Sequence, residues 1–335
     1  MEYSVSPNCD VMQTYVDSIE LRISLIVNLI IAIVAFPILV KSIIYIWKTD
    51  TFHRNTKMQI FVHLIALLIH VIGRLGLHSL DLFNYFSLGG NSSACEIIPK
   101  FYRCLILRAF YNIGLALSSM CSICLVLERY ASTVFSSNYE HCGPNYGISL
   151  VFVQILLATS FIGSLYFYAS FQPGDNVLYY CQTIASSRGN IFFVVIPLYS
   201  VLATQIIARF MFNVLIKINK KLRTRQIISL STRYNLDQSI RSINVLTHAI
   251  NYSTFVFIVL SIVTTTLHLF SSHFSKPVYI ALVEAVHILP LYSIVVPILI
   301  YKNLSDINKM DKKNLNKAIH TGSDAYFTLF AKQIS

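Results

Sequence analysis

Four of the ionisable residues inside long apolar stretches of the chain could form one site: Arg74, Arg108, Glu284 and His287. Ionisable side chains are costly in such stretches and usually face a protein interior, where they pair with one another or contact a substrate. Arg74, Arg108 and Glu284 all lie about 9–12 Å from the same end of their stretches, at ~1.5 Å per residue. We therefore expect Glu284 to neutralise Arg108 or Arg74. His287 is expected one helical turn from Glu284, on the same face.

This cluster has two interpretations. It is either the floor of a ligand pocket or an ionic latch that a ligand opens, or else a structural ion pair with outward-reaching arginines. Catalysis is not indicated, because Gly-x-Ser-x-Gly, His-Glu-x-x-His and P-loop motifs are missing from the sequence. His63, His70 and His78 recur near one face of residues 58–81, but their spacing favours interior hydrogen bonding over zinc. We predict no enzyme, no metal and no cofactor.

A second group of candidate residues marks the two ends of one apolar stretch. Cys104 stands near its start, and the triplet Glu128-Arg129-Tyr130 stands near its end. As a helix, the 25 residues from Cys104 to Arg129 span about 37 Å, which is enough to reach both faces of a bilayer. The arginine is then expected at a membrane face, where it is either a snorkelling side chain or a contact for a partner.

Seven apolar stretches must position all these residues. The 335-residue chain is 55% hydrophobic and 12% charged, whereas soluble domains carry about 25% charged residues. We predict an all-α membrane protein, a seven-transmembrane helix bundle over 23–301, with an N-terminal tail (1–22) and a C-terminal tail (302–335). A short interfacial helix is expected around 303–318, and 233–241 should extend the sixth helix. The predicted spans are 23–47, 58–81, 102–127, 146–170, 190–216, 246–270 and 278–301.

The net charge of +11 is distributed very unevenly between the two sides of this bundle. The loops and tail of one side hold 17 lysines and arginines against seven acids, and the other side holds five against seven. Lysine and arginine favour the cytoplasmic side, so we place the N-terminus outside and the C-terminus in the cytoplasm. The basic excess is thereby explained as a topology signal and a cytoplasmic docking face, and nucleic acid is excluded as a partner.

Two chemical markers are compatible with this orientation. Asn91-Ser92-Ser93 is a glycosylation sequon in a loop assigned to the outside. Four cysteines also fall outside, where disulfides persist, and four cysteines allow three pairings. These are Cys9, Cys95, Cys104 and Cys181.

The third span resembles that of the rhodopsin-like G-protein-coupled receptors in its cysteine-to-arginine spacing. The resemblance implies a disulfide from Cys104 to Cys181, and a role for Glu128, Arg129 and Tyr130 in coupling to a heterotrimeric G protein. The match is partial, because the seventh span lacks Asn-Pro-x-x-Tyr, the sixth lacks proline and the second lacks a mid-membrane aspartate. The switch of those receptors therefore cannot be transferred residue by residue.

A closer resemblance is to nematode serpentine chemoreceptors of the Sra superfamily, which includes the Sra, Srab and Sre types. It covers roughly spans two to seven, and it includes Leu127-Glu128-Arg129-Tyr130-Ala131-Ser132, Leu230-Ser231-Thr232-Arg233-Tyr234-Asn235-Leu236 and Pro290-Leu291-Tyr292. Of the three types, Srab fits best. The resemblance implies a multi-pass chemosensory receptor in the plasma membrane of sensory-neuron cilia, with a small-molecule ligand and a heterotrimeric G protein as partners.

The main alternative is a transporter or ligand-gated channel. Transporters of this size often show repeated halves and broken helices with Gly/Pro pairs at corresponding positions. The sequence shows neither feature, and an opsin is excluded because the seventh span has lysines only at its flanks, Lys276 and Lys302.

Overall fold

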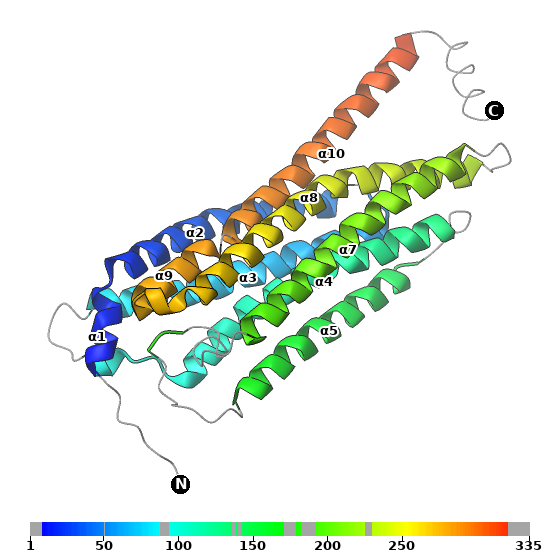
Figure 1. The fold of residues 1–335 in the computed structure, drawn as a ribbon. Coiled ribbons are helices and arrows are strands. Elements are labelled where there is room, and N and C mark those ends of the chain that lie inside the picture. The colour runs from blue at the N-terminus through cyan, green and yellow to red at the C-terminus, as the bar shows by residue number, and fades with distance from the viewer. Residues whose placement is uncertain are drawn as a thin grey trace.

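The computed structural model describes residues 9–49, 51–87, 94–135, 139, 143–170, 179–181, 192–224, 230–287 and 289–320. Within these ranges every regular element is helical, and the long helices lie side by side in an elongated bundle (Figure 1). Seven segments are long and apolar enough to cross a membrane, which confirms the predicted architecture. They are formed by α2 (Ile19–Lys48), α3 (Arg54–Ser87), α4 (Phe101–Val134), α5 (Asn145–Ser170), α7 (Phe192–Arg223), α8 (Leu230–Leu269), and α9 (Lys276–Val286) followed by α10 (Leu289–His320).

The helices extend past the predicted spans at the end of the bundle where α7 stops and α8 starts. Helix α8 already begins at Leu230, so residues 233–241 do extend the sixth helix. Residues 303–318 are helical, but the prediction that they form a separate short helix was wrong. Helix α10 continues through them without a break to His320 and projects beyond the bundle (Figure 1). The sequence from 298 to 320 contains neither glycine nor proline, so nothing in it ends the helix.

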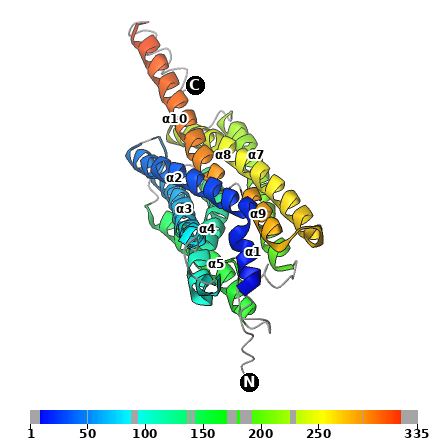
Figure 2. The ribbon, with the colours of Figure 1, turned by 90° about the vertical axis from the view of Figure 1, so that its left-hand side faces the viewer.

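Short elements gather at the opposite end of the bundle. Helix α1 (Cys9–Asp17) lies across this end (Figures 1 and 2), and the turns η1 (Ala94–Ile97) and η3 (Ser271–His273) belong to loops on the same side. Met12, Tyr15 and Val16 of α1 are buried there in an apolar cluster. Following the predicted topology, we call this the outer end and the end with the projecting α10 the inner end.

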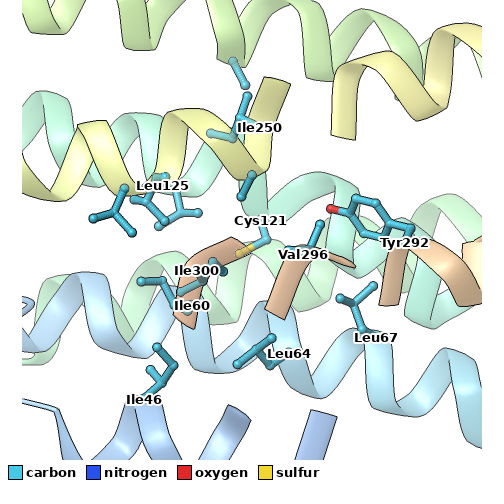
Figure 3. Packing of buried hydrophobic residues seen from close by; sticks show 14 of the residues in the cluster. Ile46, Ile60, Leu64, Leu67, Cys121, Leu125, Ile250, Tyr292, Val296 and Ile300 are labelled. Carbon is cyan, nitrogen blue, oxygen red and sulfur yellow. The ribbon is translucent and has the colours of Figure 1, made fainter. Parts of the chain in front are cut away.

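The surface and the interior of the bundle are both apolar. The largest buried cluster contains residues of α2, α3, α4, α7, α8 and α10, among them Leu64, Leu125 and Val296 (Figure 3). On the outside, large apolar side chains such as Phe83, Phe152 and Phe210 are about two-thirds exposed. Water-soluble monomers rarely carry so much exposed apolar surface, whereas a lipid bilayer covers it without cost.

Glycines let α3 and α4 approach each other closely. A Cβ atom added to Gly114 of α4 would lie 2.6 Å from the backbone oxygen of Ala66 and 2.6 Å from the backbone nitrogen of His70. A Cβ atom added to Gly73 of α3 would lie 2.8 Å from the backbone nitrogen of Tyr111. Membrane helices use small residues in this way, because packing rather than the hydrophobic effect drives their association.

We predict that Gly114→Ala destabilises the bundle by about 1–3 kcal/mol, because the added methyl group meets backbone atoms that only a shift of a whole helix can relieve. Gly163→Ala in α5 is the matched control, since an added Cβ there has no neighbour within 4 Å. The measurement is the thermal unfolding midpoint of each detergent-solubilised variant. Equal midpoints for the two variants would show that the close approach of α3 and α4 is not required.

Candidate functional site

The outer half of the bundle contains a buried ion pair. Arg108 of α4 lies 2.5 Å from Glu284 of α9, and both side chains are at most 5% exposed. The structure therefore pairs Glu284 with Arg108, which was one of the two partners expected. A buried pair of this kind is sensitive to the loss of either member, because the remaining charge has no water to solvate it.

A segment of the second outer loop, residues 179–181, closes over this pair. Arg108 donates through Nε to the carbonyl oxygen of Cys181, and the hydroxyl of Tyr180 donates to Glu284 Oε1 at 3.1 Å. Burial and the Glu284 carboxylate raise the pKa of Tyr180 well above its usual value, which keeps its hydroxyl a donor. The outer loop thus contributes two hydrogen bonds to the charged centre.

Two disulfides attach the outer segments to the helices. Cys104 at the outer end of α4 is bonded to Cys181, with their Cα atoms 5.0 Å apart. Cys9 of α1 is bonded to Cys95 of η1, with Cα atoms 4.9 Å apart. Of the three pairings that four outer cysteines allow, the structure contains this one. Because the chain between Cys9 and Cys95 includes α2 and α3, the second bond holds α1 against the outer end.

Arg74 of α3 contacts neutral oxygen atoms instead of a carboxylate. Its guanidinium donates to Asn28 Oδ1 at 2.7 Å, to the hydroxyl of Tyr111 at 2.9 Å and to the carbonyl oxygen of His287 at 3.1 Å. It also lies 4.9 Å from the ring centroid of Tyr111, a cation–π distance. Asn28 in turn donates to the carbonyl oxygen of Glu284 at 2.9 Å, so the two arginines share one polar network.

His287 stands at the end of α9, where its backbone N–H still donates to the carbonyl oxygen of Val283 at 3.2 Å, as in a helix. This position is compatible with the expected placement one turn from Glu284. Helix α9 ends at Val286, and His287 caps it with φ −70° and ψ 61°. Its ring Nδ1 lies 2.6 Å from the carbonyl oxygen of Val283, and its own carbonyl oxygen accepts from Arg74. Pro290 explains the break, because proline has no amide hydrogen to donate to the carbonyl oxygen four residues earlier, that of Val286, and its ring clashes with that oxygen. A main-chain oxygen, rather than the imidazole, is what His287 supplies to Arg74.

The triplet residues lie in a second buried network at the inner end. Arg129 lies 2.5 Å and 2.6 Å from the two carboxylate oxygens of Glu128, and both side chains are at most 1% exposed. Thr56 of α3 hydrogen bonds to both residues, and Tyr139 donates its hydroxyl to Glu128. Burial and the Glu128 charge raise the pKa of Tyr139 far above its usual value. Tyr130 is 50% exposed and is not one of these partners.

The three histidines of α3 do not form a common site. His63 lies 3.2 Å from the carbonyl oxygen of Ser118 and 3.3 Å from the hydroxyl of Tyr292, and His70 lies 3.1 Å from the carbonyl oxygen of Tyr111. His78 lies 3.9 Å from Glu284. No group of three or more potential metal ligands occurs among the described residues. The sequon residue Asn91 lies outside those residues.

The sequence reasoning found the charged members of the outer network but missed Asn28, Tyr111 and Tyr180 as their partners. Asn28 did carry a signal, since it is an amide in the middle of an otherwise apolar span. Asp81 was also overlooked, although it is buried and lies 2.5 Å from Arg103. Its position at the outer edge of α3 made it look like an ordinary loop acid.

A seven-helix membrane bundle with a disulfide-anchored outer loop and a buried Glu-Arg network at its inner end is the architecture expected of a seven-transmembrane receptor. A family profile described as "Serpentine type 7TM GPCR receptor class ab chemoreceptor" matches residues 6–335. The chain therefore belongs to this family of non-enzymatic receptors, and it is a multi-pass membrane protein. This confirms the resemblance to the nematode serpentine receptors, and to their Srab type.

Two curated relatives agree with the family assignment. The chain is 24% identical over 312 residues to "Serpentine receptor class alpha-10" of Caenorhabditis briggsae, which covers 92% of this chain and 90% of the relative. It is also 24% identical over 309 residues to the protein of the same name from Caenorhabditis elegans, covering 90% and 88%.

We predict that Glu284→Gln destabilises the protein by about 3–5 kcal/mol, because it leaves Arg108 buried beside a neutral amide. Replacing both members, as Arg108→Met with Glu284→Met, should recover much of this loss. Asp81→Asn is the matched control, since its partner Arg103 has a side chain 27% exposed to solvent. The thermal unfolding midpoint of the purified variants measures the effect. A double variant no more stable than Glu284→Gln would contradict the prediction.

Proposed function

We propose that this chain is a chemosensory receptor that binds a small extracellular chemical in the outer half of its bundle and activates a heterotrimeric G protein. We further propose the plasma membrane of sensory-neuron cilia as its location. The observation that carries the proposal is the sealed network of Glu128, Arg129, Thr56 and Tyr139 at the inner end. Arg129 is buried while this network is intact. Opening the network would expose its guanidinium at the cytoplasmic end of the bundle, where the G protein could contact it.

Helix α4 connects the two networks. Arg108 and Arg129 lie on this one helix, 21 positions apart, which corresponds to about 31 Å. The proposed ligand acts by population shift: it binds the outer network better in a state whose inner end is open. Such a ligand competes for Arg108, Glu284 or Arg74, and so changes how α9 is held against α4 and α3. The G protein then stabilises the open state from the other side, and the two affinities are reciprocally linked.

The basic inner surface supports a cytoplasmic partner. The loop between the fifth and sixth spans contains seven lysines and arginines and one acid, Asp237. Asp237 pairs with Arg223 at 2.7 Å across the inner ends of α7 and α8. The remaining cations attract anionic lipid, and they also offer an acidic protein surface a docking site.

We predict that Arg129→Ala abolishes G-protein activation and that Glu128→Gln raises basal activation several-fold. The first variant removes the exposed contact, and the second removes the charge that retains Arg129 in the resting network. Arg209→Ala is the control, because Arg209 is an exposed arginine of the inner half of α7. Second-messenger output is measured in transfected cells at equal surface expression, with a chemical panel and without. A wild-type response from Arg129→Ala would refute the coupling role.

A further inference from the structure

Arg74 differs from the other buried ionised residues that the structure describes. Arg108 is paired with Glu284, Asp81 with Arg103 and Glu128 with Arg129, each at 2.5 Å. Arg74 is 0% exposed and has no carboxylate within ion-pair distance among the described residues. Its hydrogen-bond acceptors are an amide, a hydroxyl and a main-chain carbonyl. The outer network of Arg74, Arg108 and Glu284 therefore carries a net charge of +1.

An uncompensated cation in the interior of a membrane bundle is costly. Neutral acceptors lower the cost only in part, because they contribute dipoles rather than an opposite charge. A carboxylate or another monovalent anion beside Arg74 would complete the charge balance. Charge-assisted hydrogen bonds are roughly twice as strong as neutral ones, so an anion can displace the neutral acceptors that Arg74 now uses.

Unused donors lie on the same face of α3 as this guanidinium. Arg74 Nε is buried and has no hydrogen-bond partner in the described part of the chain. His78, one helical turn further toward the outer end, is 0% exposed. Its Nε2 lies 3.9 Å from Glu284 Oε2, and neither ring nitrogen has a hydrogen-bond partner in the described part of the chain. A neutral imidazole carries one N–H, so Arg74 and His78 together can offer an anion two donors and a positive charge.

We propose that Arg74 is the anchor of a binding site for a small monovalent anion, and that the chemical sensed by the receptor is an organic carboxylate. This identity of the ligand rests on the proposed function, whereas the anion site itself does not. Chloride is also a small monovalent anion, so the experiment has to distinguish chloride from an organic carboxylate as the occupant of the site. Arg108 is already paired with Glu284, so Arg74 is the guanidinium left to hold the anion.

The test is the thermal unfolding midpoint of the purified, full-length receptor in detergent, at constant ionic strength with sulfate as the starting anion. Straight-chain carboxylates are titrated beside the primary amides and the alkylammonium ions of equal chain length, and sodium chloride is titrated separately. We expect an anion to raise the midpoint by a few degrees when it is present well above its dissociation constant. The amide should need at least ~10-fold higher concentration, and the ammonium ion should have no effect.

Variants assign the effect to Arg74. Arg74→Gln should lose the anion-dependent rise, and Arg74→Lys should keep it with weaker affinity, because lysine retains the charge without the planar fork. Arg103→Gln is the matched control and should respond like the wild type, since Arg103 is the partially exposed partner of Asp81. If Arg74→Gln does not fold, the discrimination between carboxylate and amide by the wild type still decides the question.

Each outcome of this experiment has a definite meaning. A rise with carboxylates supports both the site and the carboxylate ligand. A rise with chloride alone supports the anion site and overturns the organic carboxylate as its ligand. Equal effects of carboxylate and amide, or an unchanged anion response in Arg74→Gln, overturn it. Because the assay contains no G protein, the two proposals can fail separately: an anion-stabilised receptor that activates no G protein contradicts only the proposed function. A receptor activated by a neutral chemical and insensitive to anions contradicts only this inference.

Discussion

The ion pair between Arg108 and Glu284 joins α4 to α9, and the arrangement of the outer half depends on it. Its two members bind the segment of residues 179–181 through a carbonyl oxygen and a tyrosine hydroxyl. Because separating the pair leaves a charge without water, alternative packings of these segments are disfavoured. The disulfide between Cys104 and Cys181 adds a covalent constraint at the same place, so hydrogen bonds and a covalent bond both hold the loop.

The helices differ in how freely they can move. Gly73 and Gly114 bring the backbones of α3 and α4 so close together that sliding one helix along the other would cause steric clashes. The junction of α9 and α10 is different, because the break at His287 interrupts the helix and a hydrogen bond from Arg74 holds its carbonyl oxygen. Breaks of this type serve as hinges. In the proposed mechanism, a signal from the outer network is therefore carried by α9 and α10 moving against a fixed α3–α4 pair.

The sequence was sufficient for the overall fold and for the charged members of both networks. Apolar length identified seven spans, and the expense of intramembrane charge singled out Arg74, Arg108 and Glu284. Their partners were not predictable, because the carbonyl of His287 became available only when Pro290 interrupted a helix that periodicity had treated as continuous. The roles of Asn28 and Tyr111 depend likewise on how the helices are rotated, which one sequence does not determine.

The two networks differ in charge balance, and in the proposed mechanism this difference gives signalling a direction. Glu128 and Arg129 neutralise each other at the inner end, so that network is complete and opens only if another contact replaces the one it loses. The outer network holds two guanidinium groups and one carboxylate, and the proposed anion would balance its charge. The proposed ligand would thus bind where a negative charge is missing, and its binding free energy would be available to open the inner network, whose charges are already paired.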